Sequence, residues 1–316
     1  MTPALPDRNI LALAAFASEQ VRIRFLEFFT ANIRNPNTRK AYARAAVDFL
    51  TWCEARGVIA LPSIQPIHVA VWVEELGQSL SAPTVKQRLA ALRHLFDWLV
   101  VGQVMPVNPA QAVRGPKYSA KKGRTPVLSP EEARQLLASI PVDTVSGKRD
   151  RALIALMTYS FARVSAAVNM KVRDVYTQNR RLWVRLHEKG GKLHELPCHH
   201  TLEAYLHDYI EAGGFGDDGR GPLFRTVARG TGQLSQTPLA RQDVHTMIRR
   251  RAAGAGIETA IGCHTFRATG ITAYLKNGGT LEKAAHIANH SSTKTTQLYD
   301  RRSDDISLDE IERIQI

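Results

Sequence analysis

The side chains of this chain that could carry out chemistry gather in its second half. Tyr299 carries a phenol, and His290 precedes it by nine residues. His264 and Arg267 are three residues apart, a spacing that puts an imidazole beside a guanidinium on one face of a helix. Arg163 follows a helical stretch much earlier in the chain. Imidazoles exchange protons near neutral pH and guanidinium groups bind anions, so this set could move a proton and hold a negatively charged group.

A glycine turn adds a further cation. Lys189 and Lys192 flank Gly190-Gly191, which lies between two segments that read as strands. Two strands around Gly-Gly predict a β-hairpin. A lysine on such a turn can swing over a bound backbone, and both lysines are candidates for that role.

Helices are the main elements that must position these residues. Ser129 and Glu132 have the spacing of a capping box, with Pro130 at the first helical position. The patterns that follow predict a helix over residues 148–160, strands over 181–187 and 192–197, and helices from residue 202 onward, apart from a glycine-rich stretch at 213–221.

The first hundred residues are expected to form helices only. Apolar spacing predicts one helix from Thr38 toward Arg56, a second that begins at Pro66, and a third over residues 82–101. The predicted fold class is therefore mostly α with a small β-sheet (α+β).

The composition favours a polyanionic partner. The chain of 316 residues has 42 Lys and Arg against 29 Asp and Glu, a formal net charge of +13, and nucleic acid is the first candidate partner. Its three cysteines are far apart, and His194, Cys198, His199 and His200 lack the ligand spacing of a zinc site, so no metal is expected. No long apolar run or signal peptide is evident, which predicts a cytoplasmic protein without a membrane span.

The charge and the helix breakers divide the chain into a helical domain at residues 1–113, a basic linker at 114–126 and a second domain at 127–316. The linker holds five basic residues and no acidic one, so it either tracks phosphates or is a plain solvated connector. The helix over residues 82–101 is the best candidate for insertion into a DNA groove. The candidate DNA contacts in these segments are Lys86, Arg88, Arg93, Lys117, Lys121, Lys122 and Arg124.

The order of the chemical residues resembles the tyrosine recombinase (phage integrase) family, in its two-domain, Xer-like form. By this resemblance Arg163 matches the first catalytic arginine and Lys189 the hairpin lysine, with Lys192 as its rival. His264 and Arg267 match the His-x-Leu-Arg motif, with Phe266 for leucine. Two further matches complete the set of implied catalytic residues: His290 and Tyr299.

Several positions depart from the family pattern. Phe161-Ala162 stands for Gly-Leu before the first arginine, and Asn289 replaces a glycine before His290. Ala166 stands where the family usually carries an acid, which puts in doubt the support around Arg163. None of these departures removes a catalytic group.

The resemblance implies a helical core-binding domain, a catalytic domain and a specific reaction. Tyr299 would attack a DNA phosphodiester and form a 3′-phosphotyrosine link, with Arg163 and Arg267 on the non-bridging oxygens. Lys189 would protonate the leaving oxygen, His264 would accept the tyrosine proton and His290 would bond the scissile phosphate. No cofactor is implied, since the cationic cluster takes the place of a metal ion.

The implied partner is double-stranded DNA with specific recombination sites. Strand exchange between two duplexes implies a homotetramer on DNA and a monomer when free. Ser307 and Glu310 form a second capping box, and Leu308, Ile311 and Ile314 share one face of a short tail helix. That tail would dock on a neighbouring subunit or on its own domain.

Two other functions remain open from the sequence. A type IB topoisomerase would use the same chemistry without partner subunits, and a DNA-binding protein without catalysis would keep only the positive charge. The separate helical domain favours a recombinase, and integration or excision of a mobile element is the role that we expect.

Overall fold

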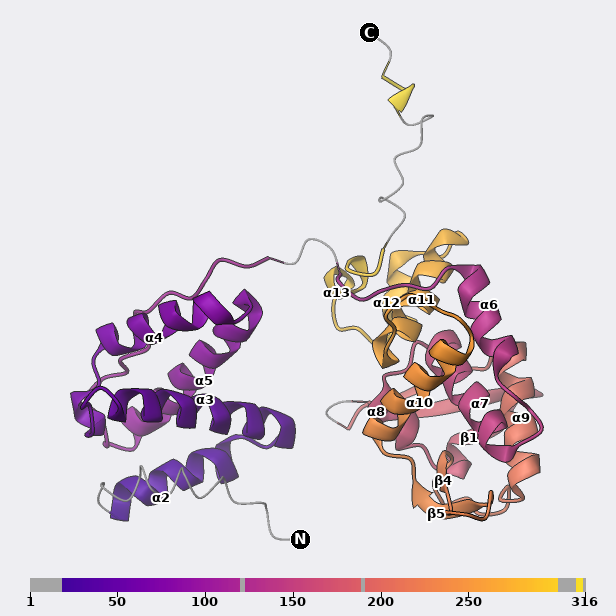
Figure 1. The fold of residues 1–316 in the computed structure, drawn as a ribbon, viewed down its shortest axis with the longest axis horizontal. Helices are drawn as coiled ribbons and strands as arrows, with labels where there is room; N and C mark the ends of the chain where they lie inside the picture. The colour runs from indigo at the N-terminus through magenta and orange to yellow at the C-terminus, as the bar shows by residue number, and fades with distance from the viewer. Residues whose placement is uncertain (1–18, 120–122, 189–190, 301–310, 315–316) are drawn as a thin grey trace. The chain divides into compact units, whose positions relative to one another are not determined.

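The computed structural model describes residues 19–119, 123–188, 191–300 and 311–314. The chain divides into two compact units, residues 1–119 and 120–316 (Figure 1). Each unit has its own hydrophobic core. The mostly helical fold with small antiparallel sheets confirms the predicted fold class. Within the described ranges, no helix is long and apolar enough to cross a membrane.

The first unit consists of helices. They are α2 (Glu19–Glu27), a π-helical turn (Phe28–Asn32), α3 (Pro36–Glu54), a 3₁₀ turn (Leu61–Ser63), α4 (Pro66–Ser79) and α5 (Ala82–Val101). The predicted bounds of α5 and the start of α4 are confirmed. The predicted start of α3 at Thr38 is wrong, because Asn35 caps the helix by accepting from the backbone N–H groups of Asn37 and Thr38.

The first part of the second unit combines helices with a three-stranded sheet. It comprises α6 (Pro130–Ser139), α7 (Val145–Tyr159), α8 (Val164–Val168), a 3₁₀ turn (Val172–Asp174) and the strands β1 (Val175–Gln178), β2 (Arg181–His187) and β3 (Leu193–Pro197). The strands pair antiparallel in the order β1-β2-β3. The capping box of Ser129 and Glu132 is confirmed, whereas α7 begins before the predicted residue 148 because Thr144 caps it.

The remainder of the second unit is helical except for one small hairpin. It comprises α9 (His200–Gly213), β4 (Arg225–Val227), β5 (Leu234–Pro238), α10 (Arg241–Gly254), α11 (Cys263–Lys276), α12 (Leu281–Ile287) and α13 (Thr293–Gln297). The expectation of helices alone after residue 202 is therefore wrong for β4 and β5, and β1 was not predicted either. These strands are short and largely polar, so they carry little periodic apolar signal.

The helices α7 and α11 pack closely at one point. A side chain on Gly270 would put its Cβ 2.1 Å from the carbonyl oxygen of Thr158. Only glycine permits this approach, which lies one helical turn after Arg267. The contact therefore fixes the position of the helix that carries His264 and Arg267.

A buried ionic network holds α7 to α10. The carboxylate of Asp150 is fully buried and accepts two hydrogen bonds from Arg149, at 2.7 and 3.0 Å, and two from Arg251, at 2.8 and 3.0 Å. A buried carboxylate is tolerated because both of its oxygens are bonded to cations.

Candidate active site

Arg267 lies at the centre of the candidate site. It sits on the second turn of α11 and is only 1% exposed. Its guanidinium donates to the backbone carbonyls of Phe161 and Ala288, which come from segments far apart in the sequence. The Nε atom has no hydrogen-bond partner among the described residues, so the guanidinium keeps N–H capacity for another anion or acceptor.

His290 connects Arg267 to the end of the chain. Its Nε2 lies 2.7 Å from Nη2 of Arg267, and its Nδ1 lies 2.9 Å from the hydroxyl of Thr296. Burial, together with Arg267, Arg163 and His264, lowers the pKa of His290 to about 4. The neutral ring accepts from Arg267 through Nε2, and this assigns the proton to Nδ1, which donates to Thr296.

Tyr299 follows α13 and is half-buried beside His290. The two rings are stacked, with centroids 5.9 Å apart and planes at 12°. The hydroxyl of Thr272, on α11, donates to the backbone carbonyl of Tyr299 at 2.8 Å. Tyr299 also acts electrostatically on Arg267 and raises its pKa, so the phenol belongs to the same group as the arginine.

Arg163 and His264 complete the group. Arg163 is the N-cap residue of α8, in an extended conformation, with 32% of its side chain exposed. His264 is exposed. Partial desolvation of its imidazole lowers its pKa, and the charges of Arg267 and Arg163 contribute in the same direction. Both arginines thus act electrostatically on both histidines, and the structure brings Arg163, His264, Arg267, His290 and Tyr299 together.

Arg163 also acts on Arg267. Burial and, after it, the charge of Arg163 together lower the pKa of Arg267 to about 10. Repulsion of this kind is typical of cations that are gathered to bind an anion. The arrangement suits an anionic group with charge on several oxygens.

Of the two candidate lysines of the hairpin, the structure describes only Lys192. Lys189 lies outside the described residues. Lys192 is exposed, and its carbonyl accepts from the backbone N–H of Glu188 at 2.8 Å.

Sequence reasoning missed the partner of Arg163. Oε2 of Glu188 lies 2.5 Å from Nη1 of Arg163, and the glutamate side chain is only 4% exposed. The alternation of β2 offered a signal, because Leu182, Val184 and Leu186 are buried and Glu188 continues their phase. Thr296 was missed as well, and nothing in its local sequence distinguishes it from the neighbouring threonines.

The candidate DNA contacts in the first unit and linker differ in their surroundings. Arg88 pairs with Asp48 at 2.6 Å, and Arg93 donates to the backbone carbonyls of Ala110 and Val113. These two arginines therefore already have partners within the first unit. The other described candidates are exposed, namely Lys86, Lys117 and Arg124. Lys121 and Lys122 lie outside the described residues.

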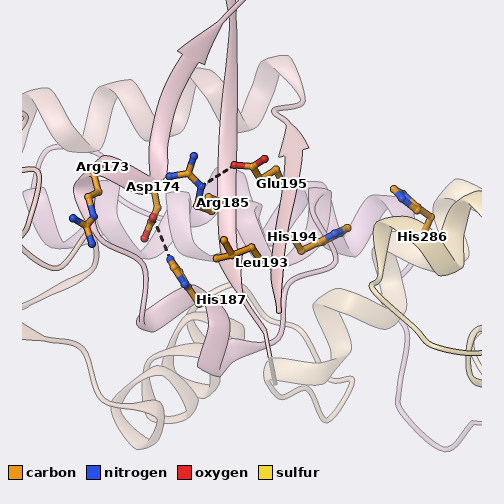
Figure 2. A pocket seen from close by; sticks show the side chains of 8 residues that line it. All are labelled: Arg173, Asp174, Arg185, His187, Leu193, His194, Glu195 and His286. Carbon is orange, nitrogen blue, oxygen red and sulfur yellow. Dashed lines mark hydrogen bonds and ion pairs between the residues drawn. The ribbon is translucent and has the colours of Figure 1, made fainter. Parts of the chain in front are cut away.

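The outer face of the hairpin lines a separate pocket of about 550 Å³. Figure 2 shows a hydrogen bond between His187 and Asp174 at 3.2 Å and an ion pair between Arg185 and Glu195 at 2.7 Å. It contains none of the clustered residues above. Across the described ranges, no group of three or more His, Cys, Asp or Glu side chains is placed to hold a metal ion.

Comparison with family models identifies both units. Residues 126–305 match the phage integrase family, and residues 23–102 match the N-terminal SAM-like domain of phage integrases. The chain belongs to the phage integrase family of tyrosine recombinases. It is accordingly a DNA strand-exchange enzyme, and the resemblance stated from the sequence is confirmed.

Curated relatives are similar over most of their length. The chain is 28% identical over 266 residues to the tyrosine recombinase XerD of Ralstonia nicotianae, a match that covers 83% of each chain. It is 29% identical over 291 residues to the tyrosine recombinase Synpcc7942_B2651 of Synechococcus elongatus, covering 87% of this chain and 88% of the relative.

Solved structures share the fold. The XerH site-specific recombinase bound to a palindromic difH substrate matches with a TM-score of 0.69 and 18% identity, over 99% of this chain and 90% of that one. A lambda integrase dimer bound to a COC′ core site matches with a TM-score of 0.67 and 16% identity, over 90% and 95% of the two chains.

Proposed function

We propose that this recombinase cleaves and rejoins DNA at specific sites through a 3′-phosphotyrosine intermediate on Tyr299. The observation that carries the proposal is the stacking of Tyr299 on His290, which is itself bonded to the buried Arg267. A phenol among cations is a better nucleophile, because positive charge stabilises its anion.

The reaction is a balanced exchange of phosphate esters. The phenol oxygen of Tyr299 attacks the scissile phosphorus, and the bond to the 5′ oxygen breaks. Arg163 and Arg267 hold the non-bridging oxygens and stabilise the charge that develops there; removal of one such donor typically costs ~100- to 1000-fold in rate. Attack by a 5′ hydroxyl on the phosphotyrosine reverses the steps, so rejoining needs no external energy source.

His264 and a lysine of the hairpin carry out the proton transfers. His264 accepts the phenolic proton, because its lowered pKa keeps the imidazole neutral at physiological pH. Lys189 donates a proton to the leaving 5′ oxygen, with Lys192 as the alternative. His290 has both ring nitrogens engaged, so it holds Arg267 and reaches the phosphate only by exchanging one of these bonds.

Both domains bind double-stranded DNA, and the second also cleaves it. Residues 1–113 form the core-binding domain, 114–126 a basic linker and 127–316 the catalytic domain. The exposed basic side chains of Lys86, Lys117 and Arg124 contact phosphates, together with Lys121 and Lys122 in the linker. Arg88 and Arg93 act within the first unit, where Arg88 joins α5 to Asp48 on α3 and Arg93 joins α5 to the segment after it.

Strand exchange requires two duplexes and four active sites, so a homotetramer assembles on DNA from free monomers. The tail helix expected over 307–316 falls mostly outside the described residues. Two of its apolar side chains, Ile311 and Ile314, are exposed and are available to dock on a neighbour. Integration or excision of a mobile element is the role we assign.

Covalent capture tests the nucleophile. Nicked duplexes from the DNA that flanks the gene are incubated with the protein, denatured and digested, and phosphotyrosyl peptides are identified by mass spectrometry. We expect adducts on Tyr299 in the wild type, none in Tyr299→Phe, and wild-type levels in Tyr205→Phe, a tyrosine outside the site.

The same captured DNA separates the alternatives. Joining of two duplexes at one sequence supports a recombinase, whereas relaxation of any supercoiled plasmid by monomers would mean a type IB topoisomerase. DNA binding without any adduct would mean a binding protein that lacks catalysis.

A further inference from the structure

The carboxylate of Glu188 lies on the buried side of the sheet, where a charged side chain is not expected. The side chains of β2 alternate, and Leu182, Val184 and Leu186 face the core while Arg185 and His187 face outward. Glu188 falls in phase with the buried set and its side chain is 4% exposed. Burial of a carboxylate costs free energy unless a cation is bound to it, so this position has a specific partner.

That partner is Arg163, at 2.5 Å between Oε2 and Nη1. The backbone of Glu188 is also fixed, because its N–H donates to the carbonyl of Lys192 and its carbonyl accepts from Gly191. The carboxylate therefore projects from an anchored Cα, whereas a third of the arginine side chain is exposed to solvent. Of the two, the glutamate is the fixed partner and the arginine is the one that it orients.

The carboxylate also opposes the repulsion between the cations. Arg163 lowers the pKa of Arg267, while Glu188 raises it. Among the described residues, Glu188 is the carboxylate whose charge acts on both guanidinium groups. Two arginines can then remain charged and close together before any phosphate is bound.

We propose that Glu188 is the positioning residue for Arg163, an inference that rests on the proposed cleavage at Tyr299. It binds one terminal nitrogen of the guanidinium and leaves the other N–H groups of the planar fork for a phosphate. A guanidinium held in one orientation reaches the transition state without reorganisation. Glu188 takes no part in proton transfer and acts on the rate only through Arg163.

Two substitutions and a matched control test this role. Glu188→Gln keeps the shape and removes the charge, and Glu188→Asp keeps the charge on a shorter arm. Glu195→Gln is the control, because Glu195 lies on the same hairpin, pairs with Arg185 at 2.7 Å and is 45% exposed on the opposite face (Figure 2). Single-turnover cleavage and DNA affinity are measured on the nicked duplex recovered by covalent capture, and melting confirms folding.

The expected result is a defect in rate rather than in binding. Glu188→Gln should cleave ~10- to 100-fold more slowly than the wild type with little change in DNA affinity, Glu188→Asp should cleave faster than the glutamine variant, and Glu195→Gln should match the wild type.

Two modified substrates identify the group through which Glu188 acts. A methylphosphonate at the scissile position replaces a charged non-bridging oxygen with methyl, so it lessens the need for Arg163, and the defect of Glu188→Gln should shrink. A sulfur atom in place of the bridging 5′ oxygen is a leaving group that needs no proton. With this substrate, the slower cleavage by Glu188→Gln should persist unchanged.

The outcomes are distinct from failure of the proposed function. If the wild type forms no adduct on Tyr299, the proposed function fails. If the wild type cleaves and Glu188→Gln cleaves equally fast, the positioning role is refuted. Rescue by the bridging sulfur alone would assign Glu188 to leaving-group protonation, and unfolding of both Glu188 variants would assign it to stability; either result overturns the inference.

Discussion

Acidification should destabilise the second unit through His290. The pKa of this imidazole falls from an ordinary 6.5 to about 4 in the folded chain, with burial as the largest cause and Arg267 next. Between these values the unfolded chain binds more protons than the folded one. Stability from His290 is therefore fully present above pH 6.5 and is lost progressively as the pH falls toward 4.

The size of the loss follows from the two pKa values. At pH 5 the unfolded imidazole is largely protonated and the folded one largely neutral, a difference equivalent to about 2 kcal/mol of unfolding free energy. Because the ring is only partly buried, solvent screening reduces this, and we expect a loss of roughly 1–2 kcal/mol. For a unit of this size, that corresponds to a fall in melting temperature of ~3–6 °C.

Calorimetry of the full chain at pH 7.5 and pH 5 measures the effect. His290→Gln offers an amide oxygen to Arg267 but has no group that titrates in this range. The melting temperature of this variant should therefore fall less between pH 7.5 and pH 5 than that of the wild type. His264 shifts in the same direction and is present in both proteins. His207→Gln is the control, since His207 is 62% exposed and outside the site. Equal pH slopes for wild type and His290→Gln would show that the ring is not held neutral in the folded state.

Three further predictions concern residues that support the site. Asp150→Asn should lower the unfolding free energy by about 3–5 kcal/mol in urea denaturation, because it leaves Arg149 and Arg251, whose side chains are 7% and 17% exposed, without their carboxylate. Asp208→Asn, whose carboxylate is 49% exposed, should cost only about 1 kcal/mol. Gly270→Ala should slow cleavage and lower the melting temperature, because its Cβ would collide with the carbonyl of Thr158; an unchanged rate would mean that α11 can shift freely. Asn289→Ala should destabilise by about 1 kcal/mol at its φ of 47° while Asn289→Gly does not, as chemical denaturation would show.

Local patterns were sufficient to predict several elements of both units. The apolar stripe over residues 82–101, the capping box at Ser129 and the Gly-Gly hairpin each depend on residues a few positions apart, and the structure has all three. The pairing of His264 with Arg267 on one helix belongs to the same class of signal. The catalytic roles assigned to these residues remain predictions.

Contacts between distant segments could not be predicted in this way. Arg267 is held by carbonyl groups of Phe161 and Ala288, which are backbone atoms that every residue possesses. The partner of Arg163 is likewise a glutamate at a strand end, where a charge usually indicates solvent. The alternation of β2 indicates that Glu188 is buried, but its pairing with Arg163 and the contacts of Arg267 depend on tertiary packing, which periodicity does not encode.

The departures from the family pattern have a common physical setting. Phe161 and Asn289 both stand where the family has glycine, and both adopt left-handed backbone conformations, with φ of 52° and 47°. Asparagine tolerates this region better than most residues, but phenylalanine is strained there and is retained by burial of its ring in a small core that Tyr299 also contacts. The carbonyl of Phe161 and that of Ala288, directly before Asn289, are the two that bind Arg267. Conformations that glycine adopts freely are thus held here by packing, and they serve to aim two carbonyl groups at one guanidinium.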